Sequence, residues 1–143
     1  MVEAALALPI MVGLVLSVID FARIHHTRSR VQVAVSQATR FAVTGRQLAD
    51  ADNPGFLLSR EASIARLVRQ ISHIDEIDTG DIEILTVESD GRMTAGAGGP
   101  GDVVLVRVTH DVKVFTPGLA LIFPGGRYQF TCSARFRNEE FVG

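Results

Sequence analysis

The first feature of the hydrophobic pattern is an uncharged run near the N-terminus. Residues 4–19 contain no charged side chain, and Ser17 is their only polar one. At a rise of about 1.5 Å per residue, a helix over this run is roughly 24 Å long. A bilayer core requires about 20 apolar residues, so the run is slightly short for a span. A helix this apolar on every side does not suit the surface of a soluble domain. The run therefore predicts a signal peptide, a membrane anchor, or a helix that leaves the membrane to pack against copies of itself.

The helical pattern continues beyond this run and becomes amphipathic. One apolar stripe has the spacing of a helix face and consists of Val31, Ala34, Val35, Ala38, Phe41 and Ala42. Neither Pro nor Gly occurs between Leu14 and Thr44, and Gly45 stands where a helix-terminating glycine is expected. The pattern predicts one helix of about 40 residues, roughly 60 Å long. Pro9 lies inside it and predicts a kink or local unwinding.

A second, shorter helix is predicted after a polar linker at 46–53. Asn53 followed by Pro54 is typical of a helix N-cap and first helical position, which places this helix at about 54–72. Its apolar face would comprise Leu57, Ile64, Leu67, Val68 and Ile71. The side chains expected to face water are Arg60, Ser63, Arg66 and Gln70.

The remainder of the chain has the pattern of strands. Residues 82–88 are rich in β-branched side chains, and residues 103–116 and 127–137 alternate between apolar and polar positions. Such alternation is typical of an antiparallel sheet with one covered face. The predicted fold class is therefore α+β: a long hydrophobic and amphipathic helix, a short second helix and a three-stranded antiparallel sheet. We expect residues 1–45 to form the membrane or filament helix and residues 46–143 the globular domain.

Composition excludes several classes of function. Fourteen Lys and Arg residues stand against sixteen Asp and Glu residues, for a formal charge of −2. This balance does not suit a nucleic-acid partner. Trp is absent and Cys132 is the only cysteine, so neither aromatic stacking platforms nor an intrachain disulfide are expected.

No pattern of catalytic, cofactor-binding or metal-ligating residues emerges from the sequence. His25 and His26 are adjacent, so they project about 100° apart on a helix and cannot share one metal ion. There is no Gly-x-Ser-x-Gly motif. The glycine-rich segment 95–101 lacks the Lys-Ser/Thr of a phosphate-binding loop, and we expect a flexible hairpin loop there. An enzyme, a cofactor, a metal ion and a small-molecule substrate are therefore not expected.

Residues 75–90 form an acidic run with no basic residue. Its spacing is not that of an EF-hand loop, although Asp75, Asp78 and Asp81 could attract Ca²⁺. A solvated face is the simplest interpretation. A third interpretation is that this run meets the arginines of the first helix on a neighbouring chain.

Three N-terminal segments together resemble the TadE-like minor pilins of tight-adherence (Flp-type) pili. The segments are MVEAALALPIM (1–11), VIDFAR (18–23) and SQATRFAVTG (36–45). They give a glutamate ahead of an apolar run that contains Pro9, then an Asp-Phe-x-Arg motif, then an amphipathic helix. The closing segment TCSARFRNEEF (131–141) also resembles the end of that family.

The resemblance implies a non-catalytic pilus subunit. Such a subunit is a single-pass protein of the bacterial inner membrane with an extracytoplasmic domain, and it assembles into an extracellular pilus for surface adhesion. The implied partners are membrane lipid, other pilin subunits and the pilus assembly machinery. The alternative is a membrane-anchored scaffold or binding module of the same secretion machine that does not polymerise.

The family also implies a basic leader, which a peptidase removes after a Gly so that the glutamate becomes the fifth mature residue. That glutamate is Glu3 here. The basic leader would supply the cytoplasmic charge and leave the C-terminal domain outside the cytoplasm. By the positive-inside rule alone, the basic residues Arg23, Arg28 and Arg30 would place the C-terminus in the cytoplasm.

Six residues of the first helix are the candidates for assembly contacts. A buried Glu3 would require a partner in a filament core, and the family's partner is the N-terminal amine of an adjacent subunit. Asp20 and Arg23 are spaced to pair within one helix or between helices, or they simply mark the membrane boundary. The full set is Glu3, Pro9, Asp20, Arg23, Arg28 and Arg30.

Overall fold

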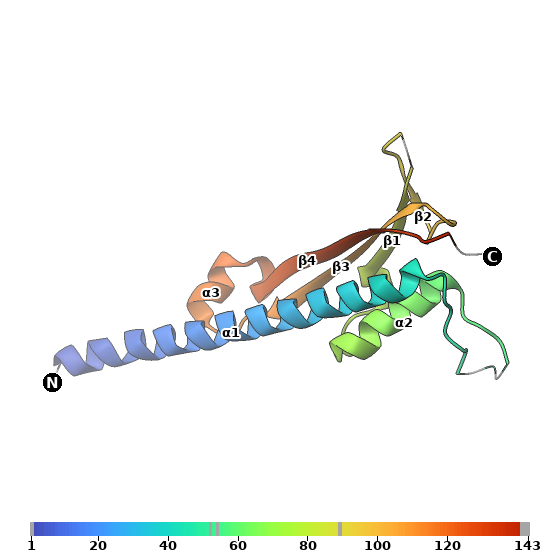
Figure 1. Ribbon diagram of the computed structural model, residues 1–143. Helices are drawn as coiled ribbons and strands as arrows, with labels where there is room; N and C mark the ends of the chain where they lie inside the picture. The colour runs from blue at the N-terminus through green and yellow to red at the C-terminus, as the bar shows by residue number, and fades with distance from the viewer. Residues whose placement is uncertain (1, 52, 54, 89, 141–143) are drawn as a thin grey trace. The chain divides into compact units, whose positions relative to one another are not determined.

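The computed structural model describes residues 2–51, 53, 55–88 and 90–140 (Figure 1). Within them, an antiparallel sheet has the strand order β2-β1-β3-β4. The α+β class is confirmed, but the sheet has four strands where the pattern predicted three. The elements in chain order are α1 (Val2–Val43), α2 (Arg60–Ser72), the 3₁₀ turn η1 (Thr79–Asp81), β1 (Ile82–Val87), β2 (Met93–Ala95), β3 (Val103–Lys113), α3 (Pro117–Ile122), the 3₁₀ turn η2 (Pro124–Gly126) and β4 (Arg127–Arg137).

The chain forms two compact units. One unit consists of Met1–Ser29 and His110–Phe130, and the other of Arg30–Thr109 and Thr131–Gly143. The first unit holds the apolar half of α1 together with α3, and the second holds α2, β1 and β2. Each unit is described below by its own contacts.

The long first helix ends where the sequence predicts. The α-helix has 42 residues and is followed by a turn in which the Gly45 N–H donates to the carbonyl of Ala42. Gly45 has a φ of 67°, a conformation that a residue with a side chain rarely adopts. The predicted unwinding at Pro9 is wrong, because the helix continues through it without interruption (Figure 1). A proline removes only one helix hydrogen bond, which its neighbours can tolerate.

The apolar stripe of the second half of α1 forms the core of the second unit. The five side chains at Val31, Ala34, Val35, Ala38 and Ala42 are all buried, whereas Phe41 is half-buried. They share the core with Ile64 and Val68 of α2 and with Val104, Val106 and Val108 of β3. A fully buried Val or Ile contributes about 1.5–3 kcal/mol through its removal from water.

The second helix begins later than predicted. Its N-cap is Ser59, whose Oγ accepts a hydrogen bond of 3.1 Å from the Ala62 N–H. Asn53 instead lies in a reversed loop closed by the bridge between Ala49 and Leu57, and its Nδ2 donates to Asp50. Leu57 is therefore exposed rather than part of the helix face. Pro54 lies outside the described residues.

Replacing Ser59 by alanine removes the cap and is expected to lower the free energy of unfolding by about 0.5–2 kcal/mol. Asn53→Ala is the matched control, because Asn53 has the same capping potential in sequence but caps no helix here. Urea unfolding of the full chain in detergent micelles, followed by helical circular dichroism, measures both variants. Equal destabilisation by the two substitutions would contradict the assigned start of α2.

The strands follow the predicted alternation. The even positions of β3, from Val104 to Val112, are buried and include His110, and Phe130 and Cys132 are the buried residues of β4. β1 pairs with β3 over its whole length, from Ile82 opposite Val108 to Val87 opposite Val103. The additional strand, β2, has three residues that are all exposed, so it carries no alternation by which to recognise it.

Two side chains predicted to face water are instead sheltered. Ser63 is buried, and its hydroxyl accepts from the Leu48 N–H and donates to the Ser59 carbonyl. Arg60 donates to the carbonyls of Gly98 and Ala42 at 2.5 and 3.2 Å and to Oδ1 of Asn138 at 3.2 Å. These positions face the interior because the glycine-rich loop and the end of α1 close over the start of α2.

Asn138 completes this polar cluster. Its side chain is 4% exposed, and Nδ2 donates to the carbonyls of Ala97 and Gly99 at 3.0 and 2.8 Å. The neighbouring Glu139 N–H donates to the Val43 carbonyl at 3.1 Å. Asn138 therefore joins the end of β4, the glycine-rich loop and Arg60.

The glycine-rich loop is held at its centre. Ala97 is buried, and its N–H donates to Oε1 of Glu61 at 3.0 Å. Burial raises the pKa of the Glu61 carboxyl, but hydrogen bonds from its own backbone N–H, from Ala97 and from Ser59, together with the Arg60 charge, outweigh burial and lower that pKa. Protonation as the pH falls through this lowered pKa therefore weakens the attachment of the loop. Gly98 has a φ of +61°, and a Cβ there would stand 3.0 Å from that of Asp102, so only glycine fits.

Candidate assembly helix and the Asp20 anchor

The apolar half of α1 is mostly uncovered within the described residues. Large side chains along it are between about a third and three quarters exposed, among them Ile10 at 72% and Val18 at 60%. The hydroxyl of Ser17 donates to the Gly13 carbonyl at 2.8 Å, so even this polar group needs no outside partner. The helix is long and apolar enough to cross a membrane. An apolar surface of this extent in water marks a membrane or protein contact.

Asp20 is buried, at 2% exposure, whereas the preceding α1 residues from Ala7 to Ile19 are exposed or half-buried. Its Oδ2 accepts hydrogen bonds from the N–H groups of Phe115 and Thr116 at 3.0 and 2.8 Å and from the Thr116 hydroxyl at 2.7 Å. Its Oδ1 accepts a longer bond from the Phe115 N–H at 3.2 Å. We call this set of contacts the Asp20 anchor. It attaches α1 to the segment that enters α3.

Arg23 lies over the same segment. One of its guanidinium nitrogens is 3.7 Å from Oδ1 of Asp20, so the two side chains pair within the helix, which is one of the alternatives that their spacing allows. Its Cζ lies 4.4 Å from the centre of the Phe115 ring, and the Lys113 ammonium lies 6.0 Å from that centre. Both distances allow a cation–π attraction. Two cations and an exposed phenyl ring therefore gather beside the buried carboxylate.

The helix α3 lies beside the apolar half of α1. A hollow between them is lined by the α1 face from Pro9 to Ser17 and by residues 116–119. A second hollow, farther along α1, is lined by Phe21, Ile24, His25, Arg28, Leu119, Phe123 and Tyr128. The stretch between the two predicted strands thus contains the short helix α3, which lies beside the uncharged part of α1.

The structure places three of the other predicted assembly residues elsewhere. Glu3 and Pro9 are exposed on the first turns of α1. Arg30 belongs to the second unit, where it donates to the His73 carbonyl at 2.8 Å. His73 is the C-cap of α2 in a left-handed conformation. Of the six residues, Asp20 and Arg23 pair with each other, and Arg28 lines the second hollow beside α3.

The acidic run has local partners. Asp78 and Asp81 form a reciprocal capping box around η1, in which the Asp78 N–H donates to Asp81 Oδ2 at 3.0 Å. Glu83 pairs with Arg107 on the neighbouring strand at 3.1 Å. Across the described residues, no group of three His, Cys, Asp or Glu side chains could hold a metal ion.

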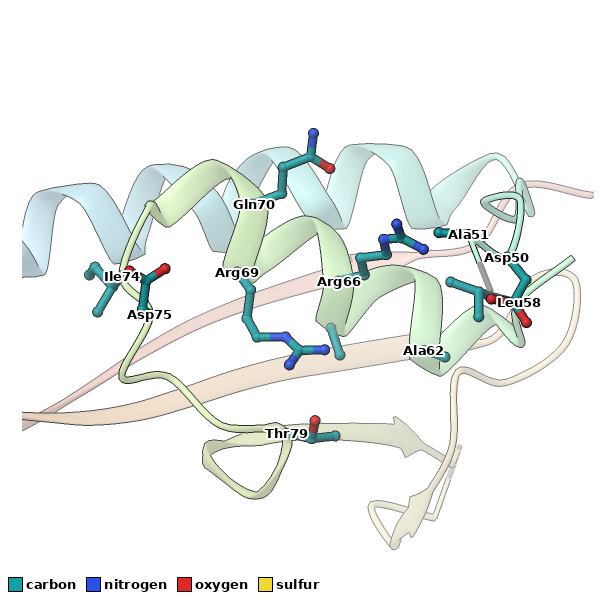
Figure 2. Close-up of a pocket in the computed structure, with 11 residues that line it drawn as sticks. Asp50, Ala51, Leu58, Ala62, Arg66, Arg69, Gln70, Ile74, Asp75 and Thr79 are labelled. Atoms are coloured by element: carbon teal, nitrogen blue, oxygen red, sulfur yellow. The ribbon is translucent and has the colours of Figure 1, made fainter. Parts of the chain in front are cut away.

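Another surface hollow lies beside α2. Figure 2 shows Arg66 and Arg69 projecting from α2, with Asp50 and Asp75 toward opposite ends of the hollow. Ala51, Leu58, Ala62, Ala65, Gln70, Ile74 and Thr79 complete its lining. These side chains supply charge and hydrogen bonds but no activated nucleophile beside a base.

The match to known proteins falls on the helix that carries the Asp20 anchor. Residues 1–40 match the TadE-like protein family. The resemblance found in the sequence is thereby confirmed over these residues, which make up less than a third of the chain. Comparisons with curated proteins and with solved structures give no significant match. The TadE-like segment includes all six candidate assembly residues.

The partners of Asp20 lie outside the TadE-like segment and were missed by the sequence analysis. Thr116 ends the predicted strand 103–116, and nothing local to it signals a carboxylate 96 positions earlier. The available signal was indirect: a lone acidic residue at the end of an apolar run requires a partner if it is buried. Asn138 lies within the closing segment that resembles the family, but no role was assigned to it.

Proposed function

We propose that this protein is a pilin-like structural subunit of a tight-adherence pilus. The apolar half of α1 anchors it in the bacterial inner membrane, and its globular part lies on the extracytoplasmic side. Its role is structural and not catalytic: the apolar half of α1 contacts lipid before assembly and other pilin subunits after assembly. The observation that carries this proposal is the coincidence of the TadE-like match with the uncovered apolar helix.

The physical argument concerns what covers that helix at each stage. In the membrane, lipid covers the exposed side chains between Leu8 and Phe21. In a filament, equivalent helices of neighbouring subunits cover them, so the apolar surface is never transferred to water. Arg28 and the acidic run remain candidates for contacts between subunits at the filament surface.

Replacing Glu3 by leucine is expected to leave membrane insertion intact and to impair incorporation into filaments. The reason is that a buried carboxylate paired with an amine of the next subunit sets the axial register, and leucine cannot form that pair. The measurement is the amount of subunit in membranes and in sheared filaments, by immunoblot. Glu88→Leu is the control, since Glu88 is an exposed carboxylate of the globular part. Normal amounts of the Glu3→Leu variant in sheared filaments would rule out this role.

Mass spectrometry of the mature N-terminus separates the pilin from the non-polymerising scaffold. A processed pilin, with the glutamate fifth, would begin two residues before Met1, and it would occur in the sheared fraction. An unprocessed protein that is confined to membranes would instead favour the anchored scaffold.

A further inference from the structure

We propose that α3 and its flanking turns insert into the outer leaflet of the membrane beside α1. The subunit would then be held by a helix and an apolar wedge rather than by a helix alone. The inference rests on the membrane anchoring proposed above and adds a second lipid-binding element to it.

The first argument is depth. Residues 116–119 line one hollow together with Pro9, Val12, Gly13, Leu16 and Ser17 of α1. These α1 residues lie inside the uncharged run, and their neighbours Ile10, Met11 and Leu14 are all more than 60% exposed. Because α3 lies on the same turns of α1, any lipid that covers these neighbours surrounds α3 as well.

The second argument is the composition of the segment. Residues 114–126 contain no charged side chain, and Lys113 and Arg127 bound them on either side. The most exposed side chains of α3 are apolar, with Leu121 at 89% and Ile122 at 70%. An apolar segment between two basic residues suits insertion below the lipid headgroups.

The third argument is the backbone, whose N–H groups need acceptors in the absence of water. The N–H groups of Ala120 and Phe123 donate to Thr116 and Leu119, and that of Val114 donates to Gly126. The N–H groups of Phe115 and Thr116 have the Asp20 carboxylate. The Asp20 anchor thus satisfies the backbone where the wedge joins β3.

The fourth argument is the position of the cations. Arg23 and Lys113 both reach the Phe115 ring, and Arg127 pairs with Asp111 beside them. Arg23 follows the uncharged run 4–19, and Lys113 and Arg127 flank the uncharged segment 114–126. The charged ends of these long side chains can extend to headgroup phosphates. They therefore mark the plane of the membrane surface on this unit.

The test uses the absence of Trp from the chain, so that one introduced Trp reports one position. The full chain is reconstituted in vesicles of phosphatidylethanolamine and phosphatidylglycerol, with or without bromine on the acyl chains. Leu121→Trp and, independently, Ile122→Trp probe the wedge. Val18→Trp probes the apolar half of α1, and Thr94→Trp on the exposed strand β2 is the control.

The expected result is that brominated lipid quenches most of the emission of the α3 variants and of Val18→Trp, and leaves that of Thr94→Trp unchanged. If lipid quenches only Val18→Trp and aqueous acrylamide quenches the α3 variants, α3 does not insert. That result would overturn the proposal, while the membrane insertion of α1 would stand. Protection of α3 from both quenchers would mean that a second protein copy covers it, which also overturns the proposal. If brominated lipid does not quench Val18→Trp, α1 itself is not in the membrane, and the proposed membrane anchoring fails together with the insertion of α3.

Discussion

Replacing Asn138 by alanine is expected to destabilise the second unit by about 2–4 kcal/mol. The substitution removes two hydrogen bonds to the carbonyls of Ala97 and Gly99 and one from Arg60, all at a site that is almost wholly buried. The two carbonyls then lack a donor, and desolvated groups without partners carry the full cost of their lost hydration. Urea unfolding of the full chain in micelles measures the loss.

The matched control is Asn53→Ala, at the only other asparagine of the chain. Asn53 is exposed and its Nδ2 donates to Asp50, so we expect a change of at most about 0.5 kcal/mol. Asn138→Asp keeps the size and the acceptor for Arg60 but loses both donors to the loop. Wild-type stability of Asn138→Asp would show that the bonds to Ala97 and Gly99 contribute little.

Replacing Asp20 by leucine is expected to release the segment 115–116 from α1. Two N–H groups and one hydroxyl lose their acceptor, and an apolar side chain cannot replace it. We expect amide exchange at Phe115 and Thr116 to become roughly 10–100-fold faster, equivalent to the loss of one to two buried hydrogen bonds. Hydrogen exchange of the full chain in micelles, resolved by NMR or by peptide mass, measures this directly.

Arg23→Ala separates the carboxylate's hydrogen bonds from its ion pair. The Arg23 side chain is 43% exposed and its nitrogen stands 3.7 Å from Asp20. Exposed pairs of this kind contribute about 0–1 kcal/mol, so the exchange rates should change by only a few-fold. If Arg23→Ala accelerated exchange as much as Asp20→Leu, the ion pair and not the backbone hydrogen bonds would hold the segment.

The sequence revealed those elements whose side chains repeat with a fixed period. The stripe from Val31 to Ala42 and the alternation in β3 and β4 are local consequences of helix and strand geometry, and each was found at its observed place. The class of fold and the helix that matches the TadE-like family followed from these patterns.

The elements that the sequence did not reveal depend on distant contacts. Asn53 and Ser59 have similar intrinsic capping preferences, and the choice between them is made by the loop pairing of Ala49 with Leu57. The strand β2 exists because β1 offers it an edge, and Arg60 is sheltered because the glycine-rich loop closes over it. Local propensity contains no information about any of these contacts.

The Asp20 anchor also sets an order of events during synthesis. Phe115 follows Asp20 by 95 positions, so the carboxylate is made long before its partners. At a bacterial elongation rate of about 5–20 residues per second, this delay is on the order of 5–20 s. During that interval α1 can already be helical, while Asp20 still lacks its hydrogen-bond donors and must be hydrated. The carboxylate becomes sheltered only when the segment 115–116 has been made and packs against α1, so its burial reports that the unit containing α3 has folded.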